Sequence, residues 1–101
     1  MYSVVKPSKV SIFEWDRGNV DKSLIKHKIK PAESEEVFQD ENQLILKDIK
    51  HSLNEERLAI IGQTTKRKVL FVAFTLRSEK VRIISARPAN TKERRLYKNL
   101  S

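Results

Sequence analysis

Basic side chains gather in the last third of the chain and could hold the phosphates of a nucleic acid. Residues 66–101 contain eleven Lys or Arg against two acids, within a chain whose total charge is +8. The same segment carries the apolar run VLFVAF at residues 69–74, which predicts a folded sheet rather than a disordered tail. An arginine on a rigid strand can be aimed at a phosphate with its planar fork of donors. A phosphodiester is therefore the first partner to consider, and a basic composition kept only for solubility is the plain alternative.

Cleaving RNA without a metal requires cations that stabilise the charge developing on the phosphoryl oxygens. The strongest candidates are Arg82 and Arg87, which lie five residues apart in and just after a predicted strand. Strict alternation puts them on opposite faces of the sheet, and a bend at Pro88 could redirect Arg87. Further cations lie on or next to predicted strands and in the last predicted helix: Arg57, Arg77, Arg94, Arg95 and Lys98.

The reaction also needs a base for the 2′-hydroxyl proton and an acid for the departing 5′ oxygen. Candidates are His51, Glu55, Tyr97 and His27. A histidine exchanges protons near neutral pH, whereas a carboxylate does so only when poor hydration raises its pKa. His51 lies in a polar turn and could equally be a plain surface residue. For His27, in the helical segment KHK, a structural hydrogen bond is the simpler explanation.

Glu55 and Arg57 stand two residues apart on one predicted strand, so their side chains would project from the same face about 7 Å apart. They could form a base beside a phosphate clamp, or an ordinary ion pair. Tyr97 lies one helical turn from Glu93. Its hydroxyl could reach the active surface, or its ring could serve packing alone.

Neither a metal nor a cofactor is expected. The chain has two histidines and no cysteine, without the spacing typical of a metal site, and its two glycines are too few for a phosphate-binding loop. Phe13 and Trp15 could stack on bases, but two aromatic residues on one face of a strand are more often core.

The elements that would position these residues follow from periodicity and turn signals. A strand is predicted at residues 10–15, after a loose start at residues 1–9. A helix capped by Asp16 or Asn19 should then run to about residue 28. Pro31 suits the first position of a second helix, which is expected to end near Phe38.

The period changes to that of strands in the second half of the chain. Four strands are predicted, at residues 44–49, 56–61, 69–76 and 81–86. The segment 69–76 is apolar on both sides, which places it in the centre of the sheet. Short connections imply antiparallel neighbours.

A last helix should follow the final strand. Asn90 and Glu93 have the spacing of a capping box, and the packing stripe would be Leu96, Tyr97 and Leu100. The predicted order is β-α-α-β-β-β-β-α. This is an α+β fold in which an antiparallel sheet packs with two N-terminal helices and one C-terminal helix.

The whole chain of 101 residues has room for one compact domain, residues 1–101. It has no cysteine and no apolar stretch near the roughly 20 residues that span a bilayer, so a cytoplasmic protein is expected. Residues 33–56 hold eight acids against two lysines, so an acidic middle precedes the basic end. This charge separation could orient a partner or could merely reflect helix surfaces.

Several sequence blocks together resemble one family. The most specific is RIISAR at residues 82–87, followed by ERRLY at 93–97. The supporting blocks are FEWD at 13–16, KH at 26–27, VF at 37–38, EER at 55–57 and IG at 61–62. In this order and spacing they resemble the BrnT-type toxins. The resemblance covers residues 13–97 and leaves residues 1–12 without an assigned role.

The resemblance implies the ribonuclease half of a bacterial type II toxin–antitoxin pair, with a RelE-like fold. It further implies metal-independent cleavage of RNA that inhibits growth, by a site built from a mixture of Arg, Lys and Tyr. The implied partner is a small BrnA-like antitoxin with a ribbon-helix-helix DNA-binding part. This antitoxin would cover the active surface, and a complex of two toxins and two antitoxins would bind operator DNA through it.

A catalytically inactive binding module is the main alternative. The same basic face would then hold nucleic acid or dock the antitoxin, and the protein would serve as a corepressor. Salt-dependent binding without strand cleavage would identify it.

Overall fold

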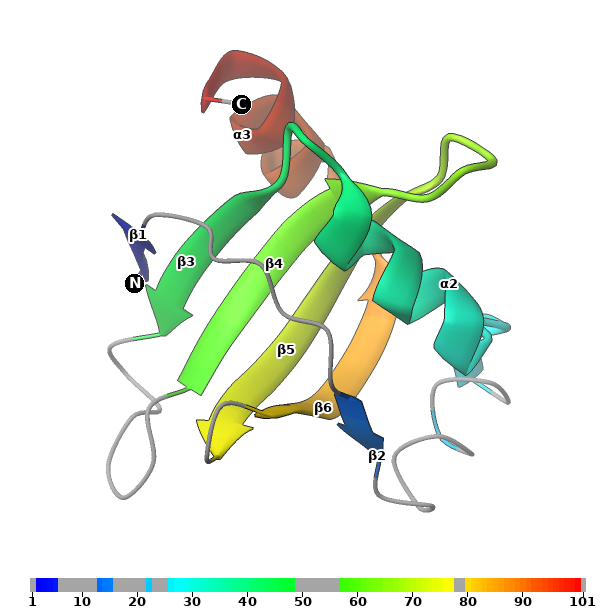
Figure 1. The fold of residues 1–101 in the computed structure, drawn as a ribbon. Helices are drawn as coiled ribbons and strands as arrows, with labels where there is room; N and C mark the ends of the chain where they lie inside the picture. The colour runs from blue at the N-terminus through cyan, green and yellow to red at the C-terminus, as the bar shows by residue number, and fades with distance from the viewer. Residues whose placement is uncertain are drawn as a thin grey trace.

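A six-stranded mixed sheet forms the centre of the computed structural model, which describes residues 2–5, 13–15, 22, 26–48, 57–77 and 80–100 (Figure 1). The strands are β1 (Tyr2–Val5), β2 (Phe13–Trp15), β3 (Leu44–Asp48), β4 (Arg57–Gln63), β5 (Val69–Arg77) and β6 (Lys80–Pro88). They lie side by side in the order β1-β3-β4-β5-β6-β2. Neighbours are antiparallel except β2, which runs parallel to β6. The central position predicted for the strand at 69–76 is confirmed.

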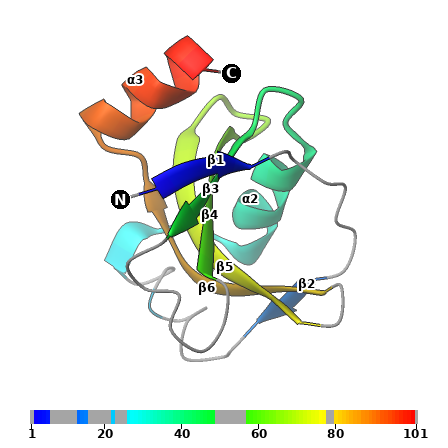
Figure 2. The ribbon, with the colours of Figure 1, turned by 90° about the vertical axis from the view of Figure 1, so that its left-hand side faces the viewer.

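Helical segments lie on both faces of the sheet (Figures 1 and 2). Helix α2 (Pro31–Glu36) continues into a 3-10 turn, η1 (Val37–Gln39), and this pair crosses one face. Helix α3 (Thr91–Leu100) packs on the opposite face, near one end of the strands. In the ranges that the structure describes, no helix is long and apolar enough to cross a membrane.

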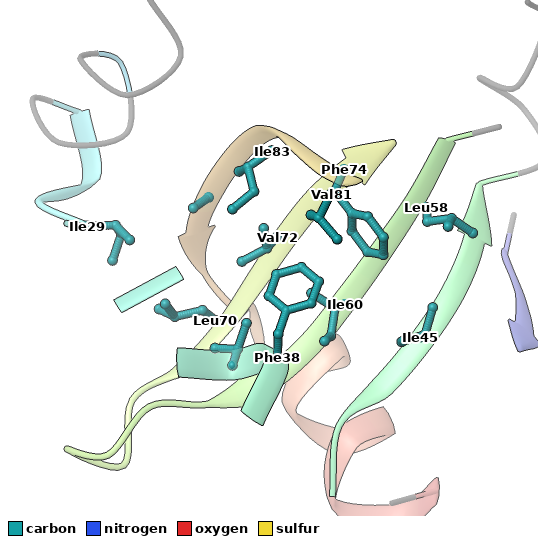
Figure 3. Packing of buried hydrophobic residues seen from close by; sticks show 12 residues of the cluster. Ile29, Phe38, Ile45, Leu58, Ile60, Leu70, Val72, Phe74, Val81 and Ile83 are labelled. Atoms are coloured by element: carbon teal, nitrogen blue, oxygen red, sulfur yellow. The ribbon is translucent and has the colours of Figure 1, made fainter. Parts of the chain in front are cut away.

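The larger core lies between the sheet and the α2–η1 pair. We call this side of the sheet the α2 face, defined by Ile45, Leu58, Ile60, Leu70, Val72, Phe74, Val81, Ile83 and Ala86. Phe38 of η1 meets Phe74 edge-on, with ring centroids 5.2 Å apart (Figure 3). It meets Phe13 in the same way, at 5.1 Å. Such aromatic pairs add about 0.5–1.5 kcal/mol each to the stabilisation from burial. These contacts fix the α2–η1 pair over the middle of the sheet.

The opposite side, the α3 face, is defined by Leu44, Leu46, Ala59, Ile61, Phe71 and Ala73. Leu96 and Tyr97 of α3 pack against it, as predicted. Leu100 was expected to join them, but this residue is 57% exposed, so this part of the predicted stripe is wrong. The capping box is confirmed: Glu93 N–H donates to Asn90 Oδ1 at 2.8 Å, and Asn90 N–H donates to Glu93 Oε1 at 2.9 Å.

Strand β2 is part of the core, as its aromatic residues predicted. Phe13 and Trp15 are partly buried against the α2-face cluster. The Trp15 indole Nε1–H donates to Glu35 Oε2 at 2.9 Å, which joins β2 to α2. Base stacking by these rings therefore has less support than packing.

The predicted antiparallel sheet with two N-terminal helices is wrong. β2 pairs in parallel with β6, with Phe13 opposite Val81 and Trp15 opposite Ile83. Within the described residues α2 is the one N-terminal α-helix for which bounds can be given; of the helix expected up to residue 28, only Lys22, Lys26 and His27 are described as helical. A pairing between segments nearly seventy residues apart leaves no mark on local periodicity, which explains the error.

The expected loose start is also corrected. Tyr2–Val5 forms β1 and pairs with β3, with Tyr2 opposite Asp48 and Val5 opposite Ile45. This adds a strand at the sheet edge that the order β-α-α-β-β-β-β-α did not contain. Its short length and the polar segment that follows it gave no periodic signal.

The turn η1 lies directly on β4 at Gly62. A Cβ added to Gly62 would come within 2.9 Å of both the Cβ and the carbonyl oxygen of Val37. Real Cβ atoms do not approach so closely, so only glycine lets η1 sit this near the strand.

Candidate functional site

A β-bulge in β6 brings Arg82 and Arg87 to the same face of the sheet. On β5, Phe74 pairs with Ile83 and the next residue back, Ala73, pairs with Ser85, so Ile84 is an extra residue. One extra residue exchanges the two faces of the strand beyond it. In an unbroken strand, residues five positions apart point to opposite faces. With the extra residue between them, Arg82 and Arg87 point to the same face. The expected redirection of Arg87 is real, but its cause is the bulge at Ile84 rather than a bend at Pro88.

Arg82 belongs to a row of side chains that crosses three strands on the α3 face. Arg57 of β4 pairs with Thr75 of β5, and Thr75 pairs with Arg82 of β6. Side chains directly opposite have Cβ atoms about 4.5–5.5 Å apart, which separates the two arginines by about 10 Å. Both are half-buried, and Thr75 between them is 3% exposed. We call these three residues the Arg57–Arg82 row.

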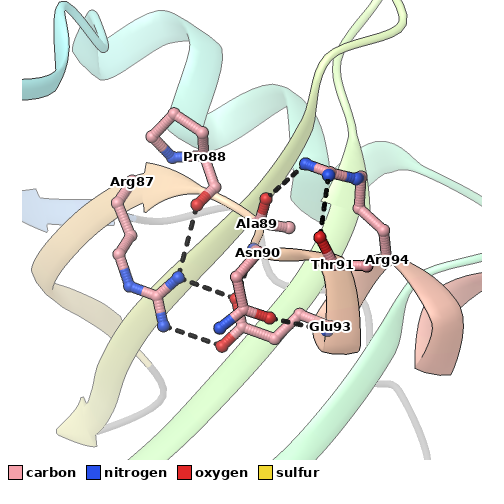
Figure 4. A network of polar contacts seen from close by, with 7 residues as sticks. All are labelled: Arg87, Pro88, Ala89, Asn90, Thr91, Glu93 and Arg94. Carbon is pink, nitrogen blue, oxygen red and sulfur yellow. Dashed lines mark hydrogen bonds and ion pairs between the residues drawn. The ribbon is translucent and has the colours of Figure 1, made fainter.

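Arg87 has a different setting, because other groups of the protein bond its guanidinium (Figure 4). Nη1 and Nη2 donate to Glu93 Oε1 and Oε2, each at 2.7 Å, and the Cζ lies 4.3 Å from the centroid of the Phe71 ring. Such a bidentate pair is among the stronger charge-assisted contacts. Burial raises the pKa of Glu93, but hydrogen bonds from Arg87 and Asn90, with the Arg87 charge, leave it lowered. Arg87 thereby fastens α3 to the end of β6.

A cavity of about 260 Å³ lies beside Arg87. We call it the Arg87 cavity, and its lining residues are Lys22, Lys26, His27, Ser85, Ala86 and Arg87. It adjoins the part of β6 that extends beyond the pairing with β2. Its volume is below the roughly 300–1,000 Å³ of pockets for larger ligands. Two lysines line it beside the paired Arg87, and this positive charge suits a phosphate with part of a nucleotide.

His27 lines the Arg87 cavity, a position that its sequence context did not indicate. It was explained by a structural hydrogen bond, yet the structure places it in the same cavity as Arg87 and Ser85. An imidazole can both accept and donate a proton, and a cationic cavity is where phosphodiester chemistry would use it. The signal in the sequence was the segment KHK, which sets two lysines beside one histidine.

Tyr97 lies outside the Arg87 cavity. Its hydroxyl donates to Asp40 Oδ2 at 2.6 Å, and the same carboxyl oxygen accepts the Gln63 N–H at 2.8 Å. Burial, together with the hydrogen bond to Asp40 and the charge of Asp40, raises the pKa of Tyr97 to about 12. The hydroxyl is therefore a poor proton donor at neutral pH, and its contact with Asp40 joins α3 to the turn before β3.

The remaining candidate site residues lie either at helix α3 or in parts of the chain that the structure does not describe. Arg94 Nη1 donates to the Ala89 carbonyl at 2.7 Å and Nη2 to Thr91 Oγ1 at 3.5 Å, so this arginine braces the start of α3 (Figure 4). Arg95 and Lys98 are exposed on α3. His51, Glu55 and the side chain of Arg77 lie outside the described residues.

The acidic and imidazole groups of the described ranges do not form a cluster of three or more that could hold a metal ion. The chemistry that the described site can offer is cationic and proton-transferring, supplied by lysine, arginine and histidine.

These features define a class: a small mixed-sheet protein with a cationic cavity suited to one phosphodiester. Residues 15–93, more than half of the chain, match the family model described as "Ribonuclease toxin, BrnT, of type II toxin-antitoxin system". The chain therefore belongs to the BrnT family of ribonuclease toxins, which act as part of toxin–antitoxin systems, and the resemblance seen in its sequence blocks is confirmed. The comparison with curated proteins gave no match.

Proposed function

We propose that this protein is a metal-independent endoribonuclease that cleaves RNA in the Arg87 cavity. Membership of the BrnT family supports the ribonuclease activity. The observation that carries the location is the convergence of Lys22, Lys26, His27 and Ser85 beside Arg87. These residues come from a segment before α2 and from β6, and they offer both charge and proton transfer.

In the proposed reaction the His27 imidazole takes the proton of the 2′-hydroxyl. The 2′ oxygen attacks phosphorus and the bond to the 5′ oxygen breaks, which leaves a 2′,3′-cyclic phosphate and a 5′-hydroxyl. The ammonium groups of Lys22 and Lys26 stabilise the charge on the phosphoryl oxygens, and one of them protonates the departing oxygen. Arg87, held by Glu93, forms the wall of the cavity.

The Arg57–Arg82 row lies on the same sheet face as Arg87 and would bind the RNA backbone. Glu55 and His51 remain candidates for proton transfer, while Arg77 and the basic residues of α3, Arg94, Arg95 and Lys98, remain candidates for RNA contact. The contacts of Tyr97 favour a role in stability over one in catalysis.

A cleavage assay tests the proposal. The protein should cut single-stranded RNA in excess chelator, and His27→Gln should lower kcat by about 10²–10⁴, the usual contribution of a general base. Lys26→Gln should also slow cleavage, whereas Lys92→Gln, at another exposed helical lysine that does not line the cavity, should not. Cleavage that stops with the chelator, or a fully active His27→Gln variant, would contradict the mechanism.

The partner follows from the family in outline, and its details are proposed. A BrnA-like ribbon-helix-helix antitoxin would cover the active surface in the cytoplasm and bind operator DNA for a complex of two toxins and two antitoxins. Induction of the protein in bacteria should arrest growth, and coexpression of such an antitoxin should relieve the arrest. Growth arrest that persists with the antitoxin present would argue against this pairing.

One observation favours a second function, that of an inactive binding module or corepressor. Arg87 and Tyr97, two of the residues first expected to do chemistry, are engaged in contacts inside the protein. A binding module would retain RNA in a salt-dependent way without cutting it. Intact RNA after prolonged incubation, with binding that weakens as salt rises, would support this alternative.

A further inference from the structure

We propose that a second cavity, lined by Lys28 next to His27 in the sequence, binds a phosphate of the RNA strand next to the scissile one. The proposal rests on the proposed ribonuclease function and extends it to the flanking nucleotides. The cavity has a volume of about 280 Å³. Its charged lining consists of four lysines and two acids: Lys28, Lys30, Lys66, Lys68, Glu33 and Glu36. We call it the hairpin cavity, because Lys66 and Lys68 come from the β4–β5 hairpin.

The two acids of the hairpin cavity are engaged in holding α2 against the hairpin. Glu33 Oε1 accepts the Lys30 N–H at 3.1 Å, and Glu33 Oε2 pairs with Lys68 Nζ at 3.2 Å. The backbone hydrogen bond from Lys30 is the main cause that lowers the pKa of Glu33, so this carboxylate stays charged in its contacts. Four ammonium groups against two carboxylates leave the cavity with an excess of positive charge.

Glu36 completes the attachment from the next turn of α2. Its Oε1 accepts hydrogen bonds from the Thr65 N–H at 2.9 Å and the Thr65 hydroxyl at 3.0 Å. Because the acids serve as anchors, the lysines that face the cavity are presented by a fixed scaffold.

The hairpin tip is itself tightly bonded. The Thr64 N–H donates to the Lys68 carbonyl at 2.8 Å, the Arg67 N–H to the Thr64 carbonyl at 2.9 Å, and Lys68 N–H to Thr64 Oγ1 at 3.1 Å. Arg67 adopts a left-handed backbone with φ of 64°, which a short turn requires. Lysines on such a preformed turn lose less conformational freedom on binding than lysines on a loose loop.

The two cavities are neighbours along the chain. His27 lines the Arg87 cavity and Lys28 lines the hairpin cavity, although adjacent Cα atoms are only about 3.8 Å apart. Lys28 also has a left-handed backbone, with φ of 56°, so the chain turns between the two side chains. An extended strand that lies across residues 26–30 would meet both cavities in succession.

This arrangement favours a polyanion over a single small anion. A lone phosphate would use one cavity, whereas successive phosphates of one strand can occupy two neighbouring cationic cavities. Single-stranded sites commonly follow the backbone in this way and cover roughly 4–16 nucleotides.

Binding of a non-cleavable strand tests the hairpin cavity independently of catalysis. The double variant Lys28→Gln/Lys66→Gln removes two lining charges and leaves the Glu33–Lys68 pair intact. With 2′-O-methyl RNA of about 12 nucleotides, it should bind more weakly, and the slope of log K against log salt should fall by about 0.7 for each phosphate that the variant no longer neutralises. The matched control, Lys47→Gln/Lys92→Gln, changes the net charge equally at two lysines that line neither cavity, and it should retain the wild-type slope.

Cleavage of two substrate lengths separates this proposal from the proposed function. The double variant should show a raised KM for the longer RNA and unchanged kcat/KM for a dinucleotide, which reaches only the Arg87 cavity. Lys66→Gln alone, at an exposed turn position, repeats the test if the double variant folds poorly. If the wild-type protein cleaves neither RNA, the proposed function is overturned. The binding measurement then still decides whether the hairpin cavity binds a phosphate of the strand. Unchanged binding and slope, or a defect confined to antitoxin binding, would overturn the hairpin cavity.

Discussion

Arg87 illustrates how the partner of a residue changes the role that its type suggests. Its residue type suggests a phosphate ligand, but its guanidinium is bonded to Glu93 and stacked on the Phe71 ring. His27 shows the reverse, because a residue expected to serve structure lies in a cationic cavity. Residue type limits the chemistry available, and the surroundings of the residue decide which part is used.

Replacing Glu93 by Gln should make the protein less stable in a pH-dependent way. The pKa of Glu93 is below its ordinary value of 4.5, because the bonds from Arg87 and Asn90 outweigh burial, so the folded state binds this proton more weakly than the unfolded state. The contribution of the Glu93 carboxylate to the free energy of unfolding is therefore present above about pH 4.5, and it is lost as pH falls through the pKa of Glu93 in the folded state. Urea unfolding should show Glu93→Gln about 1 kcal/mol less stable at neutral pH, and nearly equal to wild type at low pH. An equal difference at both pH values would contradict the assigned ion pair.

Removing the Tyr97 hydroxyl should affect stability and spare catalysis. Tyr97→Phe loses the hydrogen bond to Asp40, which should cost about 1–2 kcal/mol because the acceptor is a carboxyl group. Denaturant unfolding measures the loss, and kcat on RNA should stay within about twofold of wild type, since the hydroxyl lies outside the Arg87 cavity. A Tyr97→Phe variant that is as stable as wild type but does not cleave RNA would instead indicate that Tyr97 takes part in catalysis.

At the scale of elements, local patterns predicted four strands, the last helix and its capping box. They could not predict the bulge at Ile84, since a single inserted residue has no compositional mark, yet it decides which face Arg87 occupies. They also missed the parallel β2–β6 pair and β1, because those pairings join distant segments. The site depends on these non-local features, so the sequence indicated the residue types of the site more reliably than their grouping.

The contact between η1 and β4 should be intolerant of any side chain at Gly62. Gly62→Ala places a Cβ within 2.9 Å of the Val37 Cβ and backbone oxygen, and the backbone cannot move aside cheaply. Overpacking of this kind typically costs about 1–3 kcal/mol. Thermal unfolding measures it, with Ser34→Ala as the control. Among the described residues the buried Ser34 hydroxyl has no hydrogen-bond partner, so its removal should be neutral or slightly stabilising. A Gly62→Ala variant as stable as wild type would show that η1 can shift.

At the scale of the whole molecule, several described acids of the segment 33–56 are engaged in contacts with other parts of the chain. Glu33 and Glu36 bind the basic hairpin, Glu35 accepts from Trp15, and Asp40 accepts from Tyr97. These four acids thus serve as acceptors that join segments distant along the chain. Lysines and arginines line the two neighbouring cavities and form the Arg57–Arg82 row. Part of the net charge of +8 is therefore gathered at these sites.

The most direct test of the central claim is a crystal structure of the protein with 2′-O-methyl RNA, whose blocked 2′ oxygen cannot attack. We expect a phosphate in the Arg87 cavity, with its oxygens near the ammonium groups of Lys22 and Lys26 and the adjacent 2′ oxygen within hydrogen-bond distance of His27. A strand bound elsewhere, with His27 remote from every 2′ oxygen, would contradict it.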